Sequence, residues 1–404
     1  MDNERCCSIS KNWQEMERFD WKRTIRANIL VLRVVGVWPP DDEEYGCNLY
    51  TAYKITNFLF LQASILFFQT AFLLLNLIDL QAVTGTIFVL LMEMLAPLKS
   101  YSLFRNMKML KQLMITINSD LFQPKNAQQR SLIQPTLDAW KKIVSAYWFF
   151  TLSWLFLLML SPIFDERVEY RLPFLAWYPY NTKTSPQFEL TYLHQFVAVT
   201  TISITNISID SLIAALNMYI GAQFEILCDD LRNFYDAGKD SRDEVKERLK
   251  NCVHHHREIL KFAQNANKFY NMTILEEFFA GAICIGLSMF QLTVVPPFSS
   301  EFHSFISYAN AISVQVFMYC WFGNEIELKS TKLPYAIFES DWTSLPQEVK
   351  QEMIIFLIRT QRPLKMSAFG LFYLSLETFV RILRTAWSYF ALLRQVNLRK
   401  QNSQ

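Results

Sequence analysis

Glycine is scarce in this chain, and so are the loops that many nucleotide-binding enzymes need. Only 9 of the 404 residues are glycine, and the sequence contains no Gly-rich phosphate loop. The zinc-protease pattern H-E-x-x-H and the nucleophile pattern G-x-S-x-G are absent from the sequence as well. We therefore expect neither enzyme activity nor a cofactor.

Histidine and net charge are low too. The chain has 5 histidines and a formal net charge of +2, which is too small a charge to indicate nucleic-acid binding. Three histidines are consecutive, at His254, His255 and His256. Because consecutive helical residues point about 100° apart, these three side chains cannot converge on one ion. We predict a solvent-exposed helix face there and no metal site.

Apolar residues, by contrast, are abundant, at 51% of the chain. A helix that crosses a bilayer needs about 20 mostly apolar residues. Five such stretches contain no Asp, Glu, Lys or Arg: 55–78, 143–164, 190–209, 278–300 and 302–324. Two weaker stretches carry charges, namely 80–104 with Glu93 and Lys99, and 366–396 with Glu377, Arg381, Arg384 and Arg394. We predict an all-α membrane protein with seven transmembrane helices.

Basic residues are distributed unevenly between the predicted spans. The N-terminal segment and every second connection hold 28 Lys and Arg residues, whereas the other segments hold 6. Since basic flanks are retained on the cytoplasmic side, we expect a cytosolic N-terminus and an extracellular C-terminus. The charged first 28 residues do not resemble a cleaved signal peptide. None of the 7 cysteines lies in a predicted extracellular loop, so we expect reduced thiols.

The predicted spans divide the chain into five parts. These are a cytosolic N-terminal segment (1–52), helices 1 to 6 (53–326), a cytosolic anchor helix region (327–363), a last helix (364–396) and an extracellular tail (397–404). Apolar residues continue at helical spacing over 99–117 and 226–268. We expect these helices to extend beyond the bilayer into a cytosolic layer of packed helices.

Four spans carry paired side chains that suit a small apolar ligand. The pairs are spaced i, i+4, so each pair shares one helix face, and they lie in the expected outer halves of the spans: Phe88 and Met92, Phe150 and Trp154, Thr201 and Thr205, Tyr308 and Ile312. Large aromatic and Met side chains with a few hydroxyls are typical of apolar ligand pockets. Ordinary packing between helices is the alternative. The loop 165–189, rich in Pro and aromatic residues, can cover such a pocket or anchor the chain at the membrane interface.

Two acidic residues lie inside predicted spans, Glu93 and Asp210. Intramembrane carboxylates are functional candidates, but each can equally be buried in a structural pair. Both interpretations remain open from the sequence.

The last span carries a mostly polar stripe. Its members recur at steps of 3 and 4: Thr378, Arg381, Thr385, Ser388, Leu392 and Gln395, with Val396 beside the outer end. Glu377 precedes Arg381 by four residues and can pair with it. Such a stripe faces water or protein rather than lipid. It either lines a pore between several subunits or forms a seam buried within one subunit.

Three segments carry a family resemblance. "VVGVWPPD" at 34–41, "CWFGNEIELKSTKLPYAIFESDW" at 320–342 and "RTQRPLKMSAFGLFYLSLETFVRILRTAWSYFALLRQ" at 359–395 resemble the insect odorant receptors. The match extends over the whole chain in length, topology and loop sizes, and the last 80 or so residues carry the specific motifs. The chain lacks the long cytosolic insertion of the family's co-receptor, so it resembles a tuning subunit.

This resemblance implies an odorant-gated cation channel in the plasma membrane of olfactory sensory neurons. In it, a tuning subunit that binds a small volatile ligand forms a heterotetramer with the co-receptor, within membrane lipid and without nucleic acid. The ligand site then lies among Phe88, Met92, Phe150, Trp154, Thr201, Thr205, Tyr308 and Ile312. The last helix lines the pore with Arg381 and Ser388, and Leu392, Gln395 and Val396 form the gate. The presence of Arg394 beside Gln395 departs from the family pattern.

Other receptor classes fit less well. A gustatory receptor of the same superfamily would end in a "TYxxxxxQF"-like motif, where this chain has "SYFALLRQV". A seven-helix metabotropic receptor would carry D-R-Y-like and N-P-x-x-Y motifs, which are absent. A transporter would move substrate without channel currents.

Overall fold

Helices make up most of the part of the chain that the structure describes. The computed structural model describes residues 18–39, 49–164, 172–235 and 241–402. The longer helices are α5 (Leu80–Arg105), α7 (Ala127–Phe164), α8 (Gln187–Arg232), α9 (Arg242–Val294), α10 (Ser300–Ser330) and α13 (Leu376–Asn402). The shorter ones are α2 (Lys22–Val34), α3 (Leu49–Asn57), α4 (Ser64–Leu75), α6 (Met107–Ile117), α11 (Leu333–Glu339) and α12 (Gln347–Thr360). A π-helical stretch, Phe58–Ala63, joins α3 to α4, and 3₁₀ turns cover Asp120–Phe122 and Trp342–Ser344.

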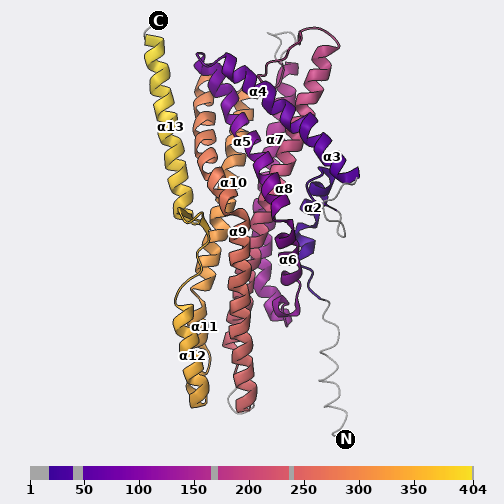
Figure 1. Cartoon of the computed structure of the whole chain (residues 1–404). Coiled ribbons are helices and arrows are strands. Elements are labelled where there is room, and N and C mark those ends of the chain that lie inside the picture. Colours follow the sequence, from indigo (N-terminus) through magenta and orange to yellow (C-terminus); the bar gives the residue numbers. More distant parts are fainter. Residues whose placement is uncertain (1–17, 40–48, 165–171, 236–240, 403–404) are drawn as a thin grey trace.

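Six helical segments of the described chain are long and apolar enough to cross a membrane. They are Leu49–Leu75, Ala82–Arg105, Ala127–Met159, Gln187–Arg232, Arg242–Val294 and Glu301–Glu339, and they contain the first six predicted spans at least in part. At 1.5 Å per residue, the 53-residue helix α9 is about 80 Å long, far more than the roughly 30 Å of a bilayer core. The predicted extension of helices beyond the apolar layer is therefore present (Figure 1).

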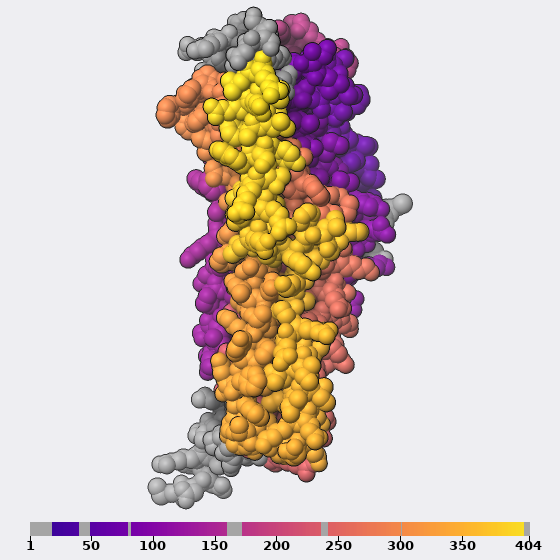
Figure 2. All heavy atoms as spheres, turned by 90° about the vertical axis from the view of Figure 1, so that its left-hand side faces the viewer, coloured from indigo at the N-terminus to yellow at the C-terminus, as the bar shows by residue number. Residues whose placement is uncertain are grey.

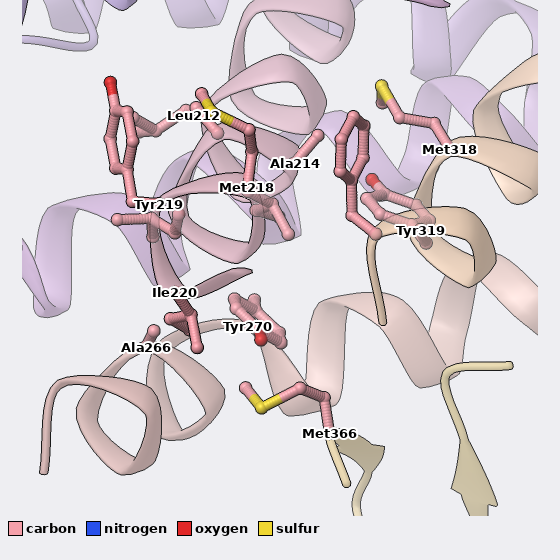
Figure 3. Packing of buried hydrophobic residues seen from close by; sticks show 14 of the residues in the cluster. Leu212, Ala214, Met218, Tyr219, Ile220, Ala266, Tyr270, Met318, Tyr319 and Met366 are labelled. Atoms are coloured by element: carbon pink, nitrogen blue, oxygen red, sulfur yellow. The ribbon is translucent and has the colours of Figure 1, made fainter. Parts of the chain in front are cut away.

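Tightly packed side chains from α8, α9 and α10 form the centre of the bundle. Tyr219 of α8, Tyr270 of α9 and Tyr319 of α10 are fully buried (Figure 3). The Tyr219 hydroxyl donates a 2.9 Å hydrogen bond to the carbonyl oxygen of Trp21, which is itself fully buried. This bond holds the residue before α2 against α8, so the N-terminal helix is part of the packed structure.

The predicted last span, 366–396, is wrong at its beginning. A two-stranded antiparallel hairpin precedes the helix, formed by β1 (Ser367–Ala368) and β2 (Phe372–Tyr373), with Ser367 opposite Tyr373. Gly370 turns the hairpin with a φ of +74°, a conformation that favours glycine. Helix α13 begins only at Leu376 and continues through Asn402, into the predicted tail 397–404. In Figure 2 it runs along the outside of the bundle, above α11 and α12.

The prediction of a solvent-exposed face at the three histidines is also wrong. Only His254 is exposed, whereas His255 and His256 are buried. The His255 Nε2 atom lies 3.0 Å from the Gln223 amide oxygen, and the His256 ring packs edge-on against Phe356 of α12. Other elements cover these two faces of α9, which the local sequence does not reveal. No cluster of metal-ligating side chains occurs among the described residues.

Candidate functional site

A network of charged and polar side chains lies at the centre of the helix bundle. The Lys99 ammonium of α5 pairs with Asp210 of α8 at 2.7 Å and with Glu277 of α9, and all three side chains are at most 1% exposed. The amide of Gln315 in α10 donates to Asp210 at 2.7 Å and to Glu277 at 2.9 Å. Five helices contribute to the network, because the Tyr147 hydroxyl of α7 also donates to Asp210.

The network shows whether Asp210, one of the two acidic residues within the predicted spans, is buried in a structural pair. Asp210 accepts hydrogen bonds from Lys99, Tyr147, Gln315 and Tyr319, so it is a paired structural group. One ammonium group therefore faces two carboxyl groups in this network.

A cavity of about 50 Å³ lies directly against this network. Tyr147, Glu277 and Gln315 belong both to the network and to the cavity wall. The full wall comes from α5, α7, α8, α9 and α10 and consists of Val89, Met92, Glu93, Tyr147, Thr151, Trp154, Val199, Ile202, Ser203, Asn206, Ile207, Glu277, Tyr308, Ala311, Ile312 and Gln315. The wall is mostly apolar with a few polar groups, as in many small-molecule sites.

Four of the eight predicted ligand residues line this cavity: Met92, Trp154, Tyr308 and Ile312. The Trp154 and Tyr308 rings lie 5.0 Å apart, centre to centre. The Tyr308 hydroxyl donates to the Phe88 carbonyl oxygen at 2.8 Å, which fixes the ring between α10 and α5. The two residues predicted on α10, Tyr308 and Ile312, therefore share the face that lines the cavity.

The other four predicted residues lie outside this cavity. Phe88 packs its ring against Tyr308 and lines a neighbouring cavity of about 160 Å³. Phe150 is partly buried against the core. Thr201 and Thr205 donate their hydroxyls to backbone carbonyl oxygens one helical turn earlier, and Ile202 and Asn206 face the cavity instead. On α8 the residues that line the cavity are thus next to the predicted ones in the sequence.

The neighbouring cavity lies toward the turn between α9 and α10. Trp154 and Val89 line both cavities and separate them. Residues 172–175, the described part of the predicted lid nearest the bundle, cover this second space. The Gln195 side chain of α8 bonds both the amide and the carbonyl group of Phe174, so this segment is held against α8.

Most of the polar stripe on helix α13 lies on the exposed surface of the chain. Thr378, Ile382, Ala386 and Phe390 are buried against the bundle, whereas Arg381, Thr385, Ser388 and Gln395 are exposed. Leu392 and Val396 are also exposed, at 58% and 45%. Apart from Thr378, the stripe is therefore not a seam buried within one subunit.

The predicted charge pair on α13 is present. Arg381 lies 2.8 Å from Glu377, with both side chains largely exposed at 61% and 81%. Before the hairpin, the Glu327 carboxylate of α10 lies 2.8 Å from Lys365 and raises the pKa of this lysine. This surface pair links the segment before the hairpin to α10.

The long apolar helices define a multi-pass membrane protein, and a cavity lies inside its helix bundle. The chain belongs to the 7tm Odorant receptor family, because the sequence model of that family matches residues 79–387. Its relatives are insect odorant receptors and not enzymes.

Two curated relatives and one solved structure indicate how far the similarity extends. Odorant receptor Or1 of Anopheles gambiae is 22% identical over 96% of this chain and 98% of its own length. Odorant receptor 46a, isoform A, of Drosophila melanogaster is 22% identical over 80% of this chain and 84% of its own. The olfactory receptor OR5 of Machilis hrabei, solved in complex with eugenol, shares the fold with a TM-score of 0.80 and 19% identity, over 94% of this chain and 100% of its own.

Proposed function

We propose that this chain is an odorant-binding tuning subunit that assembles with the odorant-receptor co-receptor into a heterotetrameric, non-selective cation channel. It lies in the plasma membrane of olfactory sensory neurons, with the N-terminus in the cytosol. Helix α13 is the seventh transmembrane helix and ends outside the cell. Its 27 residues span about 40 Å, enough to cross a bilayer core of about 30 Å.

The observation that carries this proposal is the exposed polar stripe on α13. Arginine inside a bilayer costs at least about 2.5 kcal/mol, so a stripe that contains Arg381 disfavours contact with lipid. A water-filled axis between subunits gives these side chains a polar environment. In this arrangement Arg381 and Ser388 line the pore, and Leu392, Gln395 and Val396 form the gate near its outer end.

The cavity of about 50 Å³ beside Trp154 and Tyr308 is the proposed ligand site. It is smaller than most ligand pockets, but rotation of the Trp154 side chain would join it to the neighbouring space of about 160 Å³. A small volatile molecule fits a site of this kind. The eugenol complex of the Machilis receptor, which has the same fold, supports this ligand class.

Helix α10 is the proposed link between ligand and pore. Tyr308 and Ile312 of α10 line the cavity. About two turns further along, the Phe317 ring of the same helix contacts Phe379 of α13 at 5.4 Å. A shift of α10 caused by ligand would therefore be passed directly to the pore helix.

Assembly is supported by a groove of about 830 Å³ between α9 and α12, at the end of the bundle far from the C-terminus. Helix α12 is held there by the pairs Arg242–Glu348 and Lys246–Glu352, and Arg242 lowers the pKa of the Glu348 carboxyl. Ile355 of α12 lines this groove and is 70% exposed. An exposed apolar face beside a groove is typical of a contact between subunits.

The deciding experiment is a recording of cation current in cells that express this chain with and without the co-receptor, across a panel of volatile compounds. We expect current evoked by a subset of compounds only when both chains are present. Current that never depends on the co-receptor would exclude the tuning-subunit assignment, and transport of a compound without current would favour a carrier.

A further inference from the structure

Glu93 of α5 is a buried carboxylate whose structural role the helix bundle leaves unexplained. Its side chain is 2% exposed and lines the cavity beside Trp154. Neither carboxylate oxygen forms a hydrogen bond to any residue that the structure describes. The Gln69 amide of α4 lies close enough to influence the Glu93 carboxyl group, but neither side chain reaches the distance and angle of a hydrogen bond to any described residue. A buried polar group without a partner is costly, so a native one requires an explanation.

Two further acceptors in the same wall lack partners. They are the Asn206 amide oxygen of α8 and the Thr151 hydroxyl oxygen of α7, neither of which forms a hydrogen bond within the described chain. In addition, Glu277, the second carboxyl group beside Lys99, lines the same wall. A cavity of only about 50 Å³ thus has several acceptor atoms in its wall.

We infer that the ligand of this cavity is a compact molecule with a primary amine head group, which binds Glu93. This inference rests on the proposed ligand site and specifies its chemistry. A protonated amine has three N–H donors, which matches the acceptors of Glu93, Asn206 and Thr151. The apolar part of the molecule packs against Trp154 and Tyr308, whose ring faces also attract a cation.

The assignment does not depend on which partner brings the proton. A neutral amine that meets a protonated Glu93 takes up the carboxyl proton, and the products are an ammonium ion and a carboxylate. A protonated amine that meets an ionised Glu93 forms the same pair. An alcohol offers one donor and a hydrocarbon none, so both leave acceptors of this wall unpaired.

The test compares three compounds of equal heavy-atom count: 3-methylbutylamine, 3-methylbutan-1-ol and 2-methylpentane. Dose responses are recorded at fixed pH from cells that express the chain with its co-receptor, for the wild type and for Glu93→Gln. We expect the amine to be at least about tenfold more potent than the alcohol. In Glu93→Gln the amine should lose about tenfold in potency or more, while the response to the alcohol changes little.

Two variants serve as controls. Glu247→Gln makes the same change at an exposed residue of α9 that pairs with Lys250, and it should leave all three dose responses unchanged. Glu93→Asp keeps a carboxylate and should retain part of the amine preference. If Glu93→Gln does not reach the cell surface, Glu93→Asp replaces it in the comparison, with a smaller expected loss of amine potency.

A second readout separates this inference from the channel function. The purified chain is titrated with each compound, and the Trp154 fluorescence is isolated by comparison with Trp154→Phe. Quenching by the amine that Glu93→Gln abolishes supports the inference even if no compound evokes current, in which case the channel proposal fails alone. Current evoked by the alcohol or the alkane but not by the amine overturns the inference and leaves the channel proposal intact. Absence of any amine effect in both assays overturns it as well.

Discussion

Gly286 of α9 faces Ala386 of α13 at very close range. A β-carbon on Gly286 would lie 2.8 Å from the Ala386 carbonyl oxygen and 3.0 Å from the Tyr389 β-carbon. Because one of these atoms belongs to the backbone, it cannot move aside without displacing the helix. The position of the proposed pore helix is therefore set by the absence of a side chain at residue 286.

We predict that Gly286→Ala displaces α13 from α9 and lowers stability by about 1 to 3 kcal/mol, the usual cost of overpacking. The apparent unfolding temperature of the purified protein measures the effect, and channel current should change with it. Gly85→Ala in α5 is the matched control, because its nearest atom would be 3.7 Å away. Equal unfolding temperatures for the two variants would contradict the close contact.

The Lys99 network leads to a second prediction. Lys99→Met leaves Asp210 and Glu277 buried without their cation, and removal of one partner from a buried pair costs about 3 to 5 kcal/mol. We expect a lower unfolding temperature and reduced surface expression. Lys141→Met is the control, since Lys141 and Asp138 form an exposed pair at 3.5 Å and such pairs contribute about 1 kcal/mol or less. A Lys99→Met protein as stable as this control would mean that the network is not ionised.

A third prediction concerns the aromatic wall of the cavity. Trp154→Ala removes the ring that contacts Tyr308 and separates the two cavities. We expect the concentration of ligand for half-maximal current to change by about tenfold or more, with surface expression intact. Phe149→Ala truncates an aromatic residue of the same helix that is 65% exposed, and it should leave the dose response unchanged. Identical responses for both variants would exclude Trp154 from the ligand site.

Most of the bundle was predictable from the sequence because its signals are local. Uninterrupted apolar stretches located the five uncharged spans, and apolar spacing located the extensions beyond them. The hairpin before α13 was not predictable, because its strands have two residues each. The position of the hairpin depends on a long-range contact, because Leu374, directly after β2, packs against Gly323 of α10. The contact is so close that a β-carbon added to Gly323 would lie 2.2 Å from the Leu374 β-carbon.

The candidate site was only partly predictable, since helix rotation and pairing depend on other helices. Thr201 and Thr205 looked suitable for a pocket because they carry hydroxyls, but these hydroxyls bond the backbone of their own helix. Glu93 and Asp210 were equivalent in the sequence. They differ in the fold because the partners of Asp210 come from α5, α7 and α10, and no local pattern reports which carboxylate these partners reach.

The last prediction tests the pore directly. Gln395 is exposed on α13 between the exposed apolar residues Leu392 and Val396. If these three residues of each subunit face the conduction path, a charge at residue 395 acts on every permeating ion at close range. The sign of that charge then decides whether cation permeability rises or falls. Gln395→Lys should reduce cation permeability relative to anions, Gln395→Glu should increase it, and Gln395→Ala should leave the charge selectivity unchanged. Reversal potentials in a sodium chloride gradient measure all three. Shifts of opposite sign for Lys and Glu would place residue 395 at the pore, whereas three identical reversal potentials would place the constriction elsewhere.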